Sequence, residues 1–259
     1  MNIEAIIEKY KNNEMSVEEY TKTTLEKIKN DKTNAYLAFD EEDSIKRAKD
    51  LDNKLKSNEK LGALFGIPIA IKDNISYKNM NMTCASKMLK DFRPMFDANV
   101  VEDLLKEDAI IIAKTNMDEF AMGARGKTSY FGPVKNPLDE SRVTGGSSSG
   151  SAASVAKGDV VVSLGTDTGG SVRCPASYCN IIGFKPSYSM VSRSGVVSMS
   201  NTLDQVAVFG NNISDVRVVS QTIQGPDKKD MTVRLDNYNF EGKHYEFKDK
   251  KIAYIPTSD

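Results

Sequence analysis

The chain has 259 residues, 39% of them hydrophobic and 27% charged, which is enough for one large domain or two small ones. It contains one histidine, His244, in a charged stretch near the C-terminus, which nearly excludes zinc fingers and any chemistry that needs two histidines. The net charge of -1, from 35 basic and 36 acidic residues, provides no positive field that would favour nucleic acid or an anionic membrane as a direct partner.

Residues 1–60 are rich in lysine and glutamate and have helical spacing. Apolar residues from Ile3 to Tyr10 share one helix face, and Ser16 to Glu19 fits a capping box that begins a second helix. A third helix is expected after Asp40. Because such helices bury one stripe and need a partner surface, we expect residues 1–60 to be an N-terminal helical layer that packs on the rest of the chain.

Residues 61–259 alternate between strand-like and helix-like segments. This alternation predicts an α/β core in which helices cover both faces of a mixed central sheet. The final segment, residues 250–259, is also predicted to be a strand, with no closing helix after it, so we expect this core to be incomplete at its C-terminus. The expected strands are 65–74, 109–116 and 160–167, and the expected helices are 99–108 and 150–159.

Three cysteines, Cys84, Cys174 and Cys179, are an odd number without partner ligands, which favours free thiols in a reducing cytosol. The N-terminus lacks the uninterrupted apolar core of a signal peptide, and apolar runs such as 109–113 are too short to span a bilayer. We therefore expect a cytoplasmic protein that is neither exported nor membrane-spanning.

The segment from Gly145 to Ser154 is the one low-complexity stretch of the sequence. By composition it is typical of a flexible glycine-serine linker. Its flanks favour a different interpretation, because a turn-rich stretch precedes it and a helix-forming stretch leads from it into an apolar strand. A loop fixed between packed elements is therefore the preferred prediction.

A second glycine-rich motif, residues 165–176, follows the apolar run Val160–Leu164. Gly169 and Gly170 allow consecutive backbone N–H groups to converge on one point, which places the hydroxyl of Ser171 beside a ready oxyanion pocket. This arrangement suits the nucleophile of an acyl transfer, although a phosphate would fit the same donors, and a tight turn with a capping serine is the structural alternative.

A serine nucleophile needs a base, and the single histidine lies outside these motifs, which leaves lysine as the candidate. Lys72 ends a strand in which Ile67, Ile69 and Ile71 point to one face and Lys72 points to the other, among small apolar neighbours. Burial there would lower the pKa of Lys72 from about 10.4 towards neutrality. A lysine at a strand end is otherwise typical of a solvated surface.

Lys72 precedes Ser147 by 75 residues, and Ser147 precedes Ser171 by 24. In the order of the motifs and in these intervals the sequence resembles the amidase signature family. The resemblance implies that Ser171 is the acyl-enzyme nucleophile, that Ser147, the cis-serine of the family's triad, relays its proton, and that neutral Lys72 is the base. It also implies an oxyanion hole made by four consecutive backbone N–H groups, those of Thr168, Gly169, Gly170 and Ser171.

Within that family the chain is most similar to the A subunits of glutamyl-tRNA(Gln) amidotransferases. This likeness implies a glutaminase that releases ammonia from glutamine for the transamidation of Glu-tRNA(Gln), together with B and C subunits, with tRNA reached through a partner. It implies no cofactor or metal in this chain, since ATP and Mg would belong to a partner protein, and it places Met122 and Gly123 near the substrate pocket. The likeness rests on residues 114–123, 131–137, 191–193, 200–205 and 225–232.

The sequence departs from the family in several places. Ser149 stands where glycine is usual, Ser189–Met190 replaces Gly-Arg, and 124–127 replaces a loop richer in serine and glutamate. Family members are also considerably longer, so the resemblance implies a chain that corresponds to roughly their N-terminal half. Two alternatives therefore stay open: a general small-amide hydrolase of the same family, and a non-catalytic fragment or paralogue.

One further motif points elsewhere. Residues 121–128 satisfy a relaxed phosphate-loop pattern, but they do not follow directly on a strand or open a helix, so we do not expect a nucleotide site there.

Two of the cysteines, Cys174 and Cys179, are expected to be packed thiols. Asp73 and Asp167 lack the further ligands of a metal site and are expected to accept hydrogen bonds, with Arg173 bracing the loop around Ser171.

Overall fold

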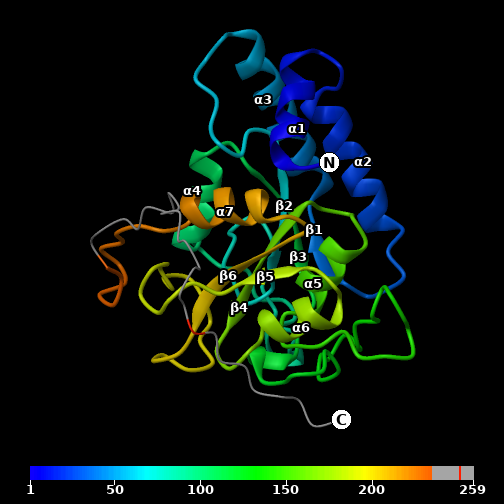
Figure 1. The fold of residues 1–259 in the computed structure, drawn as a ribbon, viewed down its shortest axis with the longest axis vertical. Coiled ribbons are helices and arrows are strands. Elements are labelled where there is room, and N and C mark those ends of the chain that lie inside the picture. The colour runs from blue at the N-terminus through cyan, green and yellow to red at the C-terminus, as the bar shows by residue number, and fades with distance from the viewer. Residues whose placement is uncertain (235–250, 252–259) are drawn as a thin grey trace.

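A computed structural model describes residues 1–234 and residue 251. Its centre is a six-stranded sheet of order β1-β3-β2-β4-β6-β5 (Figure 1). Strand β2 runs parallel to β3 and β4, whereas β1–β3, β4–β6 and β5–β6 are antiparallel, which confirms the expected mixed sheet. The strands are β1 (Tyr36–Phe39), β2 (Pro68–Lys72), β3 (Ile110–Thr115), β4 (Val162–Asp167), β5 (Ile182–Phe184) and β6 (Gln205–Gly210).

Two helices precede the first strand and a third follows it, and all three lie at one end of the molecule (Figure 1). The Ser16 hydroxyl accepts from the Glu19 N–H while the Glu19 carboxylate accepts from the Ser16 N–H, so the expected capping box is confirmed. Asp40 caps the third helix, also as expected. The helices are α1 (Ile3–Lys11), α2 (Val17–Lys29), α3 (Glu41–Lys56), α4 (Asn99–Lys106), α5 (Ser149–Ala156), α6 (Arg173–Tyr178) and α7 (Ile213–Thr222).

The N-terminal segment differs from the expected helical layer in one respect, because β1 lies within it and pairs with β3 at the sheet edge. This strand has four residues and is only partly buried, so it carries little of the alternation that predicts strands. The division at residue 60 stays a prediction. The strand expected over 250–259 lies, apart from residue 251, outside the described residues, as does His244.

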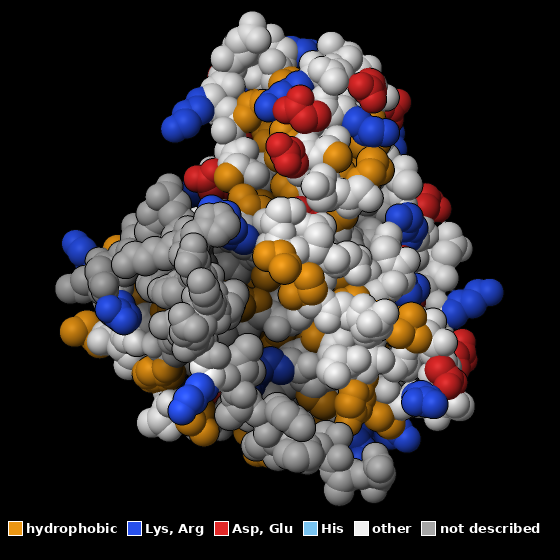
Figure 2. Space-filling view, in the orientation of Figure 1, with side chains coloured by type: hydrophobic (Ala, Val, Ile, Leu, Met, Phe, Trp, Pro, Cys, Tyr) orange, Lys and Arg blue, Asp and Glu red, His pale blue; other side chains and the backbone are white. Residues whose placement is uncertain are grey.

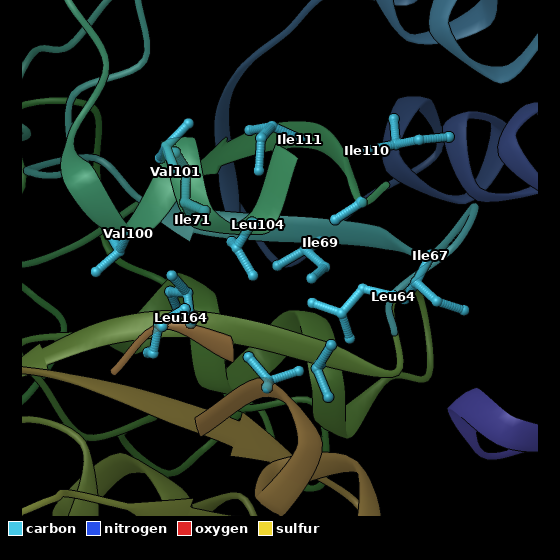
Figure 3. Close-up of a cluster of buried hydrophobic side chains, with 14 of the residues drawn as sticks. Leu64, Ile67, Ile69, Ile71, Val100, Val101, Leu104, Ile110, Ile111 and Leu164 are labelled. Carbon is cyan, nitrogen blue, oxygen red and sulfur yellow. The ribbon is translucent and has the colours of Figure 1, made fainter. Parts of the chain in front are cut away.

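Helices cover the two faces of the sheet, and the strand side chains alternate between two apolar clusters. Ile67, Ile69 and Ile71 pack on one face with α4 and α7 (Figure 3), whereas Ala70 packs on the other face with α5 and α6. This is the parity expected from the sequence. Figure 2 shows basic and acidic side chains interspersed around the N-terminal helices. Among the described residues, no helix has the length and hydropathy of a membrane span.

Candidate active site

Lys72 lies at the end of β2 and is completely buried. Its Nζ is 2.8 Å from Ser147 Oγ, 2.8 Å from Thr166 Oγ1 and 3.3 Å from the Thr166 carbonyl oxygen. Burial lowers the pKa of Lys72 to about 7, because the ammonium form loses its hydration; the carboxylates of Asp118, Asp167 and Asp204 offset part of this effect. The side chain is therefore a strong candidate for a base that works as a neutral amine.

Ser147 lies in a rigid segment between β3 and β4, and the Gly146–Ser147 peptide bond is cis. Ser148 Oγ donates to the Thr166 carbonyl at 3.1 Å, and Ser151 Oγ donates to the Leu164 carbonyl at 2.9 Å. The side chains from Ser147 to Val155 are all buried, and residues from Ser149 onwards form α5. The alternative of a flexible linker is therefore wrong, and the segment is held between packed elements as expected, although only residues 145–148 are a loop and the rest is the start of α5.

Ser171 lies on the loop between β4 and α6, and 8% of its surface is exposed. Its carbonyl oxygen accepts from the Ser148 N–H at 3.2 Å, so this loop is tied directly to the segment that carries Ser147. A Cβ atom added to Gly169 or Gly170 would meet nothing within 4 Å, which leaves open space beside the loop. Gly170 has a φ of +126°, a backbone conformation that favours glycine.

The buried Asp167 carboxylate fixes the conformation of this loop through hydrogen bonds. It accepts from the N–H groups of Gly170, Val172 and Arg173. Burial opposes its ionisation, but two hydrogen bonds from the Arg173 guanidinium, at 2.8 and 3.1 Å, and those from the backbone outweigh burial and lower the pKa of Asp167 to about 2. Arg173 thus braces the loop, as the sequence predicts.

The same contacts bear on the predicted oxyanion hole. The N–H of Gly170 donates to Asp167 at 2.8 Å, so it is already engaged. Within residues 1–234 and 251, the N–H groups of Gly169 and Ser171 have no hydrogen-bond acceptor. The Thr168 hydroxyl donates to Asp204 at 2.5 Å, which fixes the start of the loop. The expected set of four donors therefore differs from the structure at Gly170.

The segment that matches a phosphate-loop pattern already surrounds an anion, the Asp118 carboxylate. Asp118 accepts from the N–H groups of Gly126, Lys127 and Thr128 at 2.9 to 3.0 Å, and from the Thr128 hydroxyl at 2.9 Å. The donors that would hold a phosphate are thus occupied by the chain itself. The segment also lies between a short 3-10 turn and a loop rather than between a strand and a helix.

Gly123 packs against this carboxylate, and 63% of the surface of the preceding residue, Met122, is exposed. A Cβ atom on Gly123 would lie 2.4 Å from Asp118 Cγ, and the Asp118 N–H donates to the Ser147 carbonyl at 3.0 Å. Gly123 is therefore linked through Asp118 to the segment that carries Ser147. Their role in a substrate pocket stays a prediction.

The remaining thiols and carboxylates make structural contacts. Cys84 and Cys179 are buried, and burial raises the pKa of each thiol to about 12, while Cys174 is partly exposed. Asp73 accepts from the Thr83 N–H and hydroxyl and lies 3.7 Å from the buried Lys114 ammonium. In the part of the chain that the structure describes, no group of three histidine, cysteine or carboxylate side chains could hold a metal ion.

Two residues of the site, Thr166 and Asp118, are not predicted from the sequence. Thr166 supplies two oxygens to Lys72, and its hydroxyl also accepts from Asn74 Nδ2 at 3.2 Å. Asp118 contributes the largest charge effect on Lys72. Thr166 directly precedes Asp167 in the 165–176 motif, and Asp118 lies in the 114–123 motif, so both stand inside segments that the sequence singles out without assigning them a task.

A protein-family model described as Amidase matches residues 19–259. The A subunit of glutamyl-tRNA(Gln) amidotransferase from Clostridium botulinum (strain Hall) is 51% identical over 223 residues, which are 85% of this chain and 46% of that protein. A crystal structure of the corresponding protein from Thermotoga maritima has a TM-score of 0.76 at 40% identity and covers 85% of this chain and 46% of that one.

The native peptide amidase of Stenotrophomonas maltophilia has a similar fold, with a TM-score of 0.85 at 29% identity, over 90% of this chain and 49% of that one. The chain therefore spans about half the length of the curated relatives and solved structures that it matches.

Proposed function

The chain belongs to the amidase family, and from that premise we propose that it carries the catalytic centre of a glutamine amidohydrolase, the A subunit of a glutamyl-tRNA(Gln) amidotransferase. The observation that carries the proposal is the buried contact of 2.8 Å between Lys72 Nζ and Ser147 Oγ, at a lysine whose pKa is about 7. The 51% identity to the Clostridium botulinum protein supports glutamine as the substrate.

In the proposed reaction, Ser171 Oγ attacks the side-chain amide carbon of glutamine. Its proton passes to Ser147, whose own hydroxyl proton passes to Lys72. The oxygen of the tetrahedral intermediate carries the negative charge and accepts from the N–H groups of Thr168, Gly169 and Ser171, the predicted donors that remain once Gly170 is engaged by Asp167. The carbon–nitrogen bond then breaks, the proton returns to the leaving nitrogen, and ammonia departs from a γ-glutamyl ester. Water hydrolyses this ester, releasing glutamate and restoring Ser171.

Thr166 orients the amine of Lys72, the proposed base. A neutral lysine amine has two N–H groups and one lone pair. When the N–H groups donate to Thr166 Oγ1 and to the Thr166 carbonyl oxygen, the lone pair is left for the Ser147 hydroxyl. Asn74 donates to the same threonine hydroxyl and so holds it in place. Two polar side chains thereby orient the amine towards the serine relay.

The proposal assigns no cofactor to this chain. The steps that need ATP and Mg, and the contacts with tRNA, belong in this proposal to B and C subunits that would bind this one in the cytoplasm. Met122 and Gly123 are proposed to contact glutamine, because Gly123 packs against Asp118, whose N–H donates to the Ser147 carbonyl, and Met122 is the exposed residue next to it.

A serine-directed fluorophosphonate tests the proposed nucleophile. The expected result is one adduct on Ser171, located by peptide mass spectrometry and absent from Ser171→Ala. Cys174→Ala is the matched control, since it alters the next nucleophilic side chain along the loop and should label normally. A folded chain that gains no adduct would contradict the proposal and favour the non-catalytic alternative.

A general small-amide hydrolase is the second candidate, and the TM-score of 0.85 to a peptide amidase favours it. The two activities are separated by measuring ammonia release from glutamine and from simple aliphatic and aryl amides. A glutaminase releases ammonia mainly from glutamine. Faster release from the simple amides would replace the glutaminase proposal with the second candidate while leaving the proposed nucleophile in place.

A further inference from the structure

Asp118 joins three segments of the candidate site. Its N–H donates to the Ser147 carbonyl, and its carboxylate accepts four hydrogen bonds from residues 126–128. The side chain is completely buried. Among the described residues, the hydrogen bonds to the carboxylate thus come from the loop that follows Met122 and Gly123, while the backbone N–H of Asp118 donates to the segment that carries Ser147.

Two glycines leave room for this carboxylate. A Cβ atom on Gly146 would lie 2.0 Å from Asp118 Oδ2, and one on Gly123 would lie 2.4 Å from Asp118 Cγ. Both separations are far shorter than any ordinary contact between heavy atoms, so a larger residue at either position would displace the carboxylate. The side chain therefore lies between the predicted substrate segment and the peptide that leads into Ser147.

The carboxylates of Asp118, Asp167 and Asp204 act on Lys72 through their charges, whereas the buried Cys84 thiol, with a pKa of about 12, is neutral in the range where Lys72 titrates. Asp167 is paired with the Arg173 guanidinium. Asp204 accepts from Thr168, Ser198 and the N–H groups of Met199 and Ser200. Asp118 accepts only from backbone N–H groups and one hydroxyl, and within the described residues it forms no ion pair. Its charge is therefore not neutralised by a neighbouring cation.

We propose that Asp118 is a positioning residue of the site: it clamps the 122–128 segment against the Gly146–Ser147 peptide and keeps a negative charge facing Lys72. The inference rests on the proposed function, since Lys72 is a base only within that function. It also accounts for the phosphate-loop pattern of residues 121–128, because converging N–H groups are what a fixed internal carboxylate requires.

The charge of Asp118 has a measurable consequence at Lys72. The backbone of Asp118 is hydrogen-bonded to Ser147, whose hydroxyl contacts the Lys72 amine, so the carboxylate acts on Lys72 from inside the site, and its charge raises the pKa of that lysine. A negative charge favours the ammonium form, so its removal should lower the midpoint of the Lys72 titration below about 7. A residue that only braced the backbone would leave this midpoint unchanged.

The test is the pH titration of the Lys72 Cε resonance in the protein labelled with 13C-lysine, with the resonance assigned by its loss in Lys72→Met. Asp118→Asn, which keeps the size of the side chain, should lower the midpoint below that of the wild type, because the negative charge that favours the ammonium form is removed. Thr128→Val is the matched control, since it removes one hydrogen bond to the same carboxylate and keeps the charge; its midpoint should match that of the wild type.

An unchanged midpoint in folded Asp118→Asn would overturn the inference. If that variant does not fold, the wild type still tests the clamp. The amide hydrogens of Gly126, Lys127 and Thr128, which donate to Asp118, should then exchange slowly with solvent deuterium, and exchange as fast as in an unprotected loop would overturn the inference. Because neither readout needs a reaction at Ser171, a chain that the fluorophosphonate leaves unlabelled would contradict the proposed function without deciding the role of Asp118.

Discussion

Replacing the buried lysine should make the protein more stable at neutral pH. Burial lowers the pKa of Lys72 from 10.5 to about 7. Each pKa unit corresponds to about 1.4 kcal/mol, so keeping the ammonium form in the fold costs about 5 kcal/mol. Lys72→Met removes this cost with a side chain of similar length, but it also removes the hydrogen bonds to Ser147 and Thr166, each worth about 1 kcal/mol.

The net change in the free energy of unfolding depends on these opposing contributions and on the pH. At pH 7 we expect Lys72→Met to be more stable than the wild type by about 2 kcal/mol. Between pH 7 and about 10 the unfolded wild-type chain still holds the Lys72 proton while the folded protein has released it. The wild-type free energy of unfolding therefore rises by about 1.4 kcal/mol per pH unit relative to the variant, and the difference should disappear near about pH 9.

Urea denaturation at pH 6, 7, 8 and 9, followed by circular dichroism, measures this dependence. Lys49→Met is the matched control, because its exposed side chain should give a stability difference that is constant over the same range. If the curves of Lys72→Met and the wild type ran parallel from pH 6 to pH 9, the assignment of a depressed pKa to Lys72 would be refuted.

Three further substitutions test the loop around Ser171. Gly170→Ala should lower the free energy of unfolding by about 1 kcal/mol or more, since its φ is +126°, whereas Gly169→Ala, which meets open space, should change it less; urea denaturation at pH 7 distinguishes them. Arg173→Met should raise the pKa of Asp167 from about 2, so the stability advantage of the wild type should be complete above about pH 4 and shrink as the pH falls towards 2, as acid denaturation would reveal.

Much of the fold can be predicted from the sequence because its signals are local. The alternation of Ile67, Ile69 and Ile71 predicts a strand with one apolar face packed in the core, and the capping box at Ser16 predicts where α2 begins. The short strands β1 and β5 have four and three residues and are mostly partly buried, so neither carries enough periodicity to be recognised. Their places are decided by pairing with β3 and β6.

Only part of the candidate site can be predicted from the sequence. The spacing of Lys72, Ser147 and Ser171 identifies the segments that meet, and the structure joins the first two directly. The contact between Thr166 and Lys72 is harder to predict, because the two residues are 94 positions apart and the 165–176 motif that contains Thr166 does not show which of its side chains faces the lysine. The same limit applies to Asp118, whose importance arises from the packing of two glycines against it.

The most direct test of the proposed catalytic centre is the rate of Ser171 labelling by a fluorophosphonate as a function of pH. The account predicts a rate that rises with pH, with a midpoint near the Lys72 pKa of about 7, because only the neutral amine accepts the relayed proton. In Lys72→Met the rate should fall by several orders of magnitude. Labelling that proceeds at the wild-type rate in Lys72→Met, with the same pH dependence, would contradict the account.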